Sequence, residues 1–286
     1  MGDTFRLLSQ HASFGGTQSF YEHDSVEIGL PMRFAVYLPP AAKLSTVPAV
    51  MYLAGLTCNE ETFPIKASAQ GVASELGLAL IAPDTSPRKT EISGQAGSWD
   101  FGVAAGFYLD ATEAPWATHW RMESYLMQEL LVQVAKQLPI DGNRLGIMGH
   151  SMGGHGALTL ALKHEGVFKS VSALAPICAP TQCAWGRKAF AGYLGSNENH
   201  WKKHDATALL LARGKALMPQ SILIDQGLAD KFLSEQLHPH FFEAACKQVN
   251  QTLELNRHEG YDHGYYFIAS FIERHMRYHV QFLCST

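Results

Sequence analysis

Short apolar runs alternate with amphipathic segments from residue 47 onward, and this alternation restricts the fold more than any other feature of the sequence. Runs that are apolar on both faces are typical of parallel strands covered by helices. The expected strands are 49–54, 78–82, 145–148, 170–174, 221–224 and 253–255. The expected helices are 68–76, 122–138, 152–164, 239–249 and 265–282. The pattern predicts an α/β protein with a mostly parallel central sheet and helices on both faces.

The amino-terminal residues follow a different rhythm. Residues 4–38 alternate with a period of two, so that Phe34, Val36 and Leu38 share one face, which predicts antiparallel strands. Residues 83–120 and 175–205 break the strand and helix pattern and are expected to form long loops, which often carry function. No linker-like stretch interrupts the sequence, so we expect a single domain over residues 1–286.

Composition narrows the class of partner. The formal charge is −4, from 22 basic and 26 acidic residues with no block of Lys or Arg, so nucleic acid is not an expected partner. No apolar run approaches the roughly 18 residues of a membrane span, and residues 1–6 lack an apolar signal core, so no membrane partner is expected. The five cysteines are expected to be free thiols in the cytoplasm.

A Gly-x-Ser-x-Gly motif is formed by Gly149, Ser151 and Gly153 between an expected strand and an expected helix. The glycines allow a turn so tight that the serine is pushed outward in a strained conformation. Ser151 is therefore the predicted nucleophile, and the backbone N–H of Met152 is a predicted oxyanion donor at the start of the helix.

A serine hydroxyl needs a base and an acid that orients the base, in the chain order Ser, Asp or Glu, His for this arrangement. His263 follows the strand expected at 253–255 and is the predicted base. Asp225 at a strand end and Asp230 in the following loop are both possible acids, and Asp230 is favoured because a loop carboxylate can reach across to the imidazole.

The other histidines have less specific expectations. His150 and His155 are expected to be packed with hydrogen bonds. His275 and His279 are four residues apart and are expected on a solvated helix face, because no metal-binding motif accompanies them.

The second oxyanion donor should come from the loop after an early strand. Gly55 lets the backbone approach closely, so the N–H of Leu56 is the predicted donor. Cys58 is then expected near the site or packed as an inert thiol, and the sequence does not favour either.

These motifs, and others along nearly the whole chain, resemble the S-formylglutathione hydrolase family, also called esterase D. The segments that carry the resemblance are 53–58, 82–88, 98–102, 106–112, 149–158, 175–178, 185–190, 224–230 and 260–264. The resemblance implies an α/β-hydrolase fold, Ser151, Asp230 and His263 as the triad, and Leu56 and Met152 as the oxyanion donors. The chain departs from the family pattern at Lys89, Gln95 to Gly97, Ala104, which replaces Gly, and Ala184, which replaces Pro.

The activity implied by the resemblance is hydrolysis of S-formylglutathione to glutathione and formate, a step of formaldehyde detoxification, through a formyl-enzyme. The resemblance implies no cofactor or metal. It does imply a homodimer or a homotetramer. Because a formyl group is small, we expect a small acyl pocket, with Trp99, Trp185 and Phe232 as wall residues and Cys58 nearby. The alternatives are a broad short-chain carboxylesterase and a non-catalytic binding protein with a hydrolase fold; the intact triad disfavours the latter.

Overall fold

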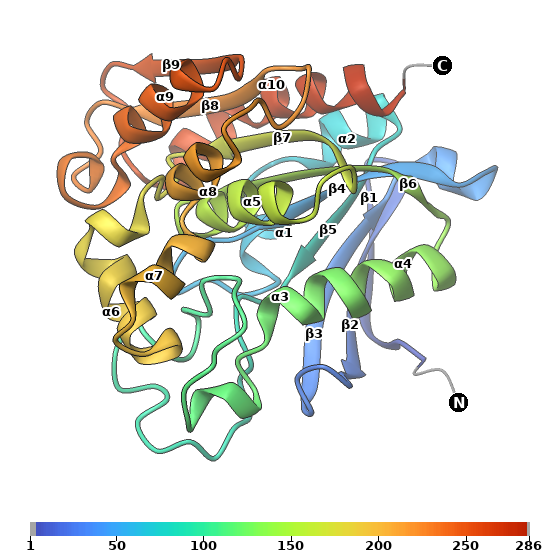
Figure 1. The fold of residues 1–286 in the computed structure, drawn as a ribbon. Helices are drawn as coiled ribbons and strands as arrows, with labels where there is room; N and C mark the ends of the chain where they lie inside the picture. The colour runs from blue at the N-terminus through green and yellow to red at the C-terminus, as the bar shows by residue number, and fades with distance from the viewer. Residues whose placement is uncertain (1–3, 285–286) are drawn as a thin grey trace.

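The computed structural model describes residues 4–284, so the first three residues of the amino-terminal segment considered above lie outside it (Figure 1). Its strands are β1 Arg6–Ser13, β2 Gly16–Asp24, β3 Pro31–Leu38, β4 Val47–Leu53, β5 Ala79–Pro83, β6 Ile140–His150, β7 Phe168–Leu174, β8 Ile222–Gly227 and β9 Leu253–His258. Its helices are α1 Thr62–Lys66, α2 Gln70–Leu76, α3 Met122–Ser124, α4 Leu131–Gln137, α5 Met152–Lys163, α6 Ala184–Leu194, α7 Glu198–Trp201, α8 Ala206–Arg213, α9 Pro239–Gln248 and α10 Tyr265–Leu283. A π-helical turn at Tyr125–Leu130 joins α3 to α4.

One sheet contains all nine of these strands, in the order β1-β2-β3-β5-β4-β6-β7-β8-β9. β1, β2, β3 and β5 pair in antiparallel fashion, and every pair from β5 to β9 is parallel. The expected parallel sheet with antiparallel amino-terminal strands is therefore confirmed. The central strands β4 and β5 are buried along their whole length, in agreement with their apolar composition.

Helices cover both faces of the sheet. α2 and α10 contact each other and lie along the upper side in Figure 1, where α10 also contacts β6, β7 and β8. α5 packs on β4, β6 and β7 from the other side, with α8 against it and α9 beyond α8. No helix in residues 4–284 has both the length and the apolar character that a membrane crossing requires.

The expectation of a loop over residues 175–205 is wrong, because α6 and α7 lie within it. The buried residues Trp185, Ala189, Phe190 and Tyr193 recur with helical spacing in α6. Gly186 and Gly192 obscure this pattern, yet they serve close packing: a Cβ at Gly186 would lie 2.1 Å from the Pro180 carbonyl oxygen. Residues 84–115, in contrast, are irregular as expected.

The expectation that His275 and His279 face solvent is also wrong. Both side chains are fully buried where α10 lies on the sheet. His279 is hydrogen-bonded to Ser170 Oγ (2.6 Å) and Ser172 Oγ (2.9 Å), and His275 to Ser172 Oγ (2.8 Å). The small hydroxyl side chains of β7 leave room for two imidazoles and bond three of their four nitrogens, and Asp225 Oδ2 bonds the fourth, which hydrophobic periodicity alone does not reveal.

Candidate active site

Four segments that follow the carboxyl ends of parallel strands meet at one edge of the sheet. Leu56 follows β4, Ser151 follows β6, Asp230 follows β8 and His263 follows β9. The carboxyl ends of parallel strands share one edge, which is where open α/β sheets bind ligands. Leu56, Ser151 and His263 line a single cavity of about 590 Å³, and Asp230 lies directly behind His263.

Ser151 occupies a strained turn between β6 and α5. Its backbone has φ +56° and ψ −118°, a conformation that is rare for residues other than glycine. The flanking glycines have no room for side chains: a Cβ at Gly149 would lie 2.1 Å from the Gly153 carbonyl oxygen, and one at Gly153 would lie 1.9 Å from that of Leu53. The turn therefore requires both glycines, as the motif predicts.

His263 and Asp230 form a short hydrogen bond, with 2.6 Å between Nδ1 and Oδ2. The Asp230 side chain has no exposed surface and also accepts hydrogen bonds from the Phe232 N–H (2.8 Å) and Gln226 Nε2 (3.3 Å). Because a carboxylate only accepts, Nδ1 of His263 donates, which leaves Nε2 unprotonated in the neutral ring. Among residues 4–284, no hydrogen bond joins the Ser151 hydroxyl to His263, and such contacts are often long in sites without substrate.

Asp225, the other acid that the sequence allows, lies in a different environment. Its buried carboxylate is hydrogen-bonded to His258 Nε2 (3.0 Å), His275 Nε2 (3.1 Å) and Arg274 Nη1 (3.3 Å). Burial opposes its ionisation, but the hydrogen bonds and charges of His275, His258 and Arg274 hold the pKa of Asp225 below its usual value. Asp225 thus joins β8 to β9 and α10 and has no hydrogen bond to His263.

Two backbone amides beside Ser151 are available to an oxyanion. Met152 is the first residue of α5, so its N–H has no acceptor within the helix. The Leu56 N–H has no acceptor among the described residues either. The residues that follow it are held in place, because the Thr57 N–H donates to the Ala104 carbonyl oxygen (3.0 Å) and the Cys58 N–H donates to the Gly55 carbonyl oxygen (3.3 Å). Two unpaired donors at one serine form a site that can stabilise negative charge on oxygen.

Three aromatic residues and Cys58, all expected from the sequence, line this cavity. The rings form a series from Trp99 to Trp185 (5.4 Å between centroids), then Phe232 (4.7 Å), then His263 (5.0 Å). The Cys58 sulfur lies 4.0 Å from the Tyr265 hydroxyl, and burial raises the pKa of the thiol above its usual value. Cys58 is therefore close to the site and is held mainly as the neutral thiol.

His150 contradicts its expectation of hydrogen-bonded packing. Its ring is buried 4.5 Å from that of His263, and neither nitrogen has a hydrogen-bond partner within residues 4–284. Burial, together with the charge of His263, lowers the pKa of His150 far below the usual value, so the ring is neutral. His155 agrees with its expectation, through a contact of 3.2 Å between Nε2 and the Phe107 carbonyl oxygen.

Lys66, Lys231 and Tyr265 also line the cavity, and the sequence reasoning did not single them out. Lys66 ends α1, a five-residue helix that hydrophobic periodicity did not reveal. Lys231 directly follows Asp230, and this adjacency was the one available signal.

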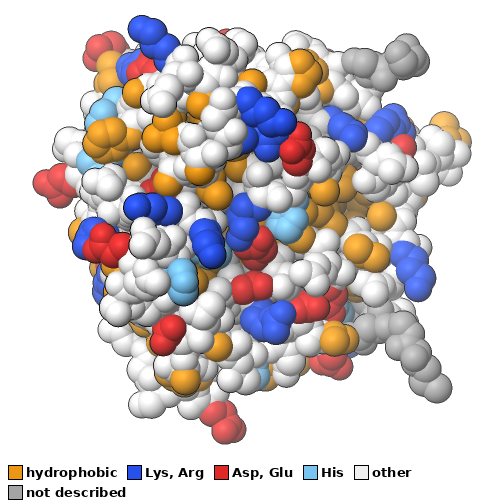
Figure 2. All heavy atoms as spheres, in the orientation of Figure 1, with side chains coloured by type: hydrophobic (Ala, Val, Ile, Leu, Met, Phe, Trp, Pro, Cys, Tyr) orange, Lys and Arg blue, Asp and Glu red, His pale blue; other side chains and the backbone are white. Residues whose placement is uncertain are grey.

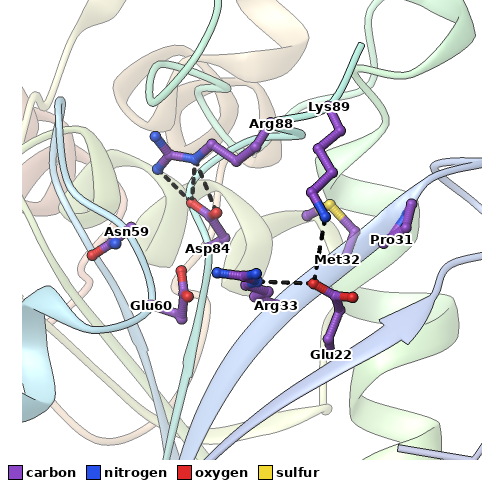
Figure 3. Close-up of a pocket in the computed structure, with 9 residues that line it drawn as sticks. All are labelled: Glu22, Pro31, Met32, Arg33, Asn59, Glu60, Asp84, Arg88 and Lys89. Atoms are coloured by element: carbon purple, nitrogen blue, oxygen red, sulfur yellow. Dashed lines mark hydrogen bonds and ion pairs between the residues drawn. The ribbon is translucent and has the colours of Figure 1, made fainter. Parts of the chain in front are cut away.

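A second cavity of about 230 Å³ is lined by Asn59 and Glu60, which directly follow the residues 55–58 that line the Ser151 cavity (Figure 3). Arg88 binds Asp84 there, through contacts of 2.6 to 3.1 Å, and it also donates to the Cys58 carbonyl oxygen (2.7 Å). Arg33 and Lys89 lie beside Glu22, at 2.9 and 3.9 Å (Figure 3). The cations of this cavity are thus neutralised by its own carboxylates, and Arg88 anchors the segment that carries Leu56.

Ala104, one of the departures from the family pattern, has a left-handed backbone with φ +62°. Glycine adopts this conformation without strain, which explains why a glycine is usual there. The Ala104 carbonyl oxygen accepts a hydrogen bond from the Thr57 N–H, so this position directly contacts the segment that carries Leu56.

No group of three or more His, Cys, Asp or Glu in residues 4–284 is arranged to hold a metal ion. Lys and Arg side chains are interspersed with Asp and Glu on the face drawn in Figure 2. The groups gathered at the site are a serine hydroxyl, an imidazole, a carboxylate and two backbone amides.

Comparisons with known proteins identify the family and agree with the fold. Residues 25–278 match the Esterase family model, described as "Putative esterase". The chain is 52% identical to the S-formylglutathione hydrolase of Mus musculus over 97% of this chain and 98% of that protein, and 50% identical to that of Arabidopsis thaliana over 94% and 95%. The structure of an S-formylglutathione hydrolase from Agrobacterium tumefaciens matches with a TM-score of 0.94 at 43% identity, covering 97% of this chain and 99% of that one. The chain therefore belongs to the S-formylglutathione hydrolase family of α/β-hydrolase esterases.

Proposed function

We propose that this protein hydrolyses S-formylglutathione to glutathione and formate, with Ser151 as nucleophile, His263 as base and Asp230 as the residue that orients His263. The observation that carries the proposal is the 2.6 Å contact between His263 and the buried Asp230 carboxylate in the cavity that contains the strained Ser151. The substrate follows from the relatives that share about half of this sequence over nearly its full length.

In the first half of the reaction, Ser151 Oγ attacks the formyl carbon while His263 Nε2 accepts the hydroxyl proton. The negative charge that develops on the carbonyl oxygen is stabilised by the Leu56 and Met152 amides. The carbon–sulfur bond then breaks, glutathione leaves as the thiolate, and the formyl group stays on Ser151. The proton on His263 Nε2 passes to the departing thiolate or to solvent, so that the imidazole is again a base for the second half. A thiolate is a good leaving group, so His263 is needed mainly as a base.

In the second half, His263 takes a proton from water, which attacks the formyl-enzyme. The ester bond to Ser151 breaks, and formate leaves as the hydroxyl regains its proton. Asp230 keeps Nδ1 of His263 protonated throughout, so that Nε2 is the nitrogen that faces the reaction.

The direct test is turnover of S-formylglutathione by the purified protein and by Ser151→Ala. We expect the variant to lose about 10⁴-fold or more in kcat, because triad members act as a unit. Short aryl esters, measured in parallel, decide between this function and a broad carboxylesterase. A negligible rate on the thioester beside rapid ester hydrolysis would rule out the proposed substrate. Labelling of Ser151 by an organophosphonate, absent in Ser151→Ala, would exclude a non-catalytic binding protein.

We also propose a cytoplasmic location and a homodimeric or homotetrameric state. Cys58, Cys178, Cys183, Cys246 and Cys284 are all free, which supports a reducing compartment. The assembly is suggested by the family resemblance, and light scattering on the purified protein tests it.

A further inference from the structure

The cavity at Ser151 is lined by two lysines that form no ion pair with any residue the structure describes. Lys66 and Lys231 both line it, and none of the described lining residues is acidic. Neither lysine forms an ion pair with any residue in 4–284, whereas Lys163, Lys188 and Lys89 pair with Glu123, Asp100 and Glu22. The second cavity shows the opposite arrangement, because its cations lie against its own carboxylates (Figure 3). The Ser151 cavity therefore favours an anionic ligand.

The two lysines come from opposite sides of the nucleophile. Lys66 belongs to the connection after β4, Ser151 follows β6 and Lys231 belongs to the connection after β8. The sheet order β4-β6-β7-β8 places the segment after β6 between the other two. The segment that bears Ser151 is thus flanked by the two segments that bear the lysines.

Each lysine stem rests beside an aromatic ring of the cavity wall. Lys66 Nζ lies 5.8 Å from the ring centroid of Tyr265, and Lys231 Nζ lies 5.0 Å from that of Phe232. Such contacts favour positions of the ammonium groups near the wall while leaving them exposed for a ligand. Phe232 also contacts His263, so Lys231 lies close to the reacting groups.

Glutathione has carboxylates in matching positions, and the one on the γ-glutamyl residue shares its carbon with an ammonium group. Its sulfur is on the central residue of the tripeptide, and one carboxylate lies at each end, on the γ-glutamyl and glycyl residues. A thioester held at Ser151 would extend a carboxylate to each side. A cavity of about 590 Å³ is within the range that accommodates ligands of this size.

We propose that Lys66 and Lys231 bind the two carboxylates of the glutathionyl group, one on each side of the thioester, and so select an anionic thiol carrier over a neutral acyl ester. This inference rests on the proposed function and names the residues that determine the substrate preference of the enzyme. The lysines bind and orient the substrate and take no part in bond making or breaking.

The experiment compares Lys66→Gln, Lys231→Gln and the double variant on two substrates. The first is S-formylglutathione, and the second is the S-formyl thioester of glutathione diethyl ester, which keeps the shape but lacks both carboxylates. For S-formylglutathione we expect KM to rise about fivefold for each lysine and about 25-fold for both, with kcat within about twofold, as for partly exposed ion pairs. The kcat/KM ratio of the acid to the diester should fall by the same factors.

Matched variants separate charge from packing. Lys66→Arg and Lys231→Arg keep the charge and should stay within about twofold of the wild type. Lys247→Gln removes an exposed lysine of α9 outside the cavity and controls for net charge. Raising NaCl from about 50 to 500 mM should raise the wild-type KM for S-formylglutathione and have a smaller effect on the double variant.

The outcomes are distinct. If either Gln variant keeps the KM of Lys247→Gln, or loses activity equally on both thioesters, the assignment of the lysines is overturned while the proposed function stands. If the wild type hydrolyses short esters but not S-formylglutathione, the proposed function fails, and the inference fails with it.

Discussion

Asp225 and Asp230 are five residues apart, yet their carboxylates do different things. Asp230 has one imidazole partner, His263, whose second nitrogen is free for chemistry. Asp225 is hydrogen-bonded to His258, His275 and Arg274 and connects β8 to β9 and α10. The surroundings of each carboxylate, rather than its residue type, separate the proposed catalytic role from a structural one.

The two asparagine variants should therefore fail in different ways. Asp230→Asn is expected to lower kcat about 10³- to 10⁴-fold with little loss of stability, because the amide can hold His263 in the wrong tautomer. Asp225→Asn should instead reduce stability by about 2 kcal/mol or more, because buried partners lose their anion. Steady-state kinetics and thermal unfolding of both variants check this. A larger kinetic defect in Asp225→Asn would reassign the acid.

Glu60 is a buried carboxyl in the second cavity that forms no ion pair with the described residues (Figure 3). Burial, and then the charge of Asp84, raises the pKa of Glu60 from 4.5 to about 7. The folded state thus binds a proton that the unfolded chain releases between these values. This contribution is complete below about pH 4.5 and is lost as the pH rises through about 7.

Glu60→Gln removes this titration. We expect the variant to gain stability relative to the wild type as the pH rises from about 5 to 8, by about 2 kcal/mol over that range. Urea unfolding of both proteins across this range provides the measurement, and Glu61→Gln, at the exposed neighbouring position, is the control. A pH-independent difference would show that Glu60 is ionised throughout.

Among the elements, α6 shows what periodicity misses. Its glycines at 186 and 192 suggest a loop, but both lie where another segment presses on the helix, Pro180 in one case and Phe101 in the other. Such contacts join residues distant in sequence or across a turn, so they leave no local periodic signal. The strands β4, β5 and β8, in contrast, are buried along their whole length and were predicted from the almost wholly apolar runs 49–54, 78–82 and 221–224.

The first residue of α6 offers a test of the departure at Ala184. Cys183 before it is extended, with φ −127° and ψ 157°, and the Ala184 N–H has no acceptor among the described residues. Proline fits both conditions, since its fixed φ suits the first turn and it needs an extended residue before it. Ala184→Pro is expected to stabilise the protein by about 0.5 to 1 kcal/mol.

Thermal unfolding should show a rise in Tm of about 1 to 3 °C. Ala191→Pro, in the interior of the same helix, should cost about 3 kcal/mol or more and serves as the contrast. A lower Tm for Ala184→Pro would mean that the start of α6 is not as the structure places it.

At the scale of the whole molecule, one nine-stranded sheet runs from β1 at one edge to β9 at the other. Ser151 could be predicted because it lies in a local motif at the end of an expected strand. Asp225 and Asp230 could be proposed as acids because they lie at and after the end of another. Lys66 belongs to no motif, and the one signal for Lys231 was its position next to Asp230. The proposed role of both lysines depends on which side chains folding brings around them, and none of the described lining residues is acidic. The buried state of His275 and His279 likewise depends on α10 meeting β7.

We infer that the chain unfolds as a single domain, and its tryptophans allow a test. All five lie between residues 99 and 201, three of them in residues 99–120 and the others in α6 and α7. Far-UV circular dichroism instead reports on helices and strands along the whole chain. If the chain is one domain, urea transitions followed by tryptophan fluorescence and by circular dichroism should coincide. An earlier fluorescence transition would identify residues 99–201 as a separate unit.

The segment 55–60 contributes to both cavities: residues 55–58 line the one at Ser151, and residues 59 and 60 line the second. In the proposed mechanism its Leu56 amide stabilises the substrate oxygen, while Arg88 and Thr85 each donate to the Cys58 carbonyl oxygen at 2.7 Å. A substitution at Arg88, which lines the second cavity, is therefore expected to slow catalysis, because the Leu56 amide would be held less firmly in position. A survey of variants limited to residues of the Ser151 cavity would miss the contribution of Arg88 and Thr85.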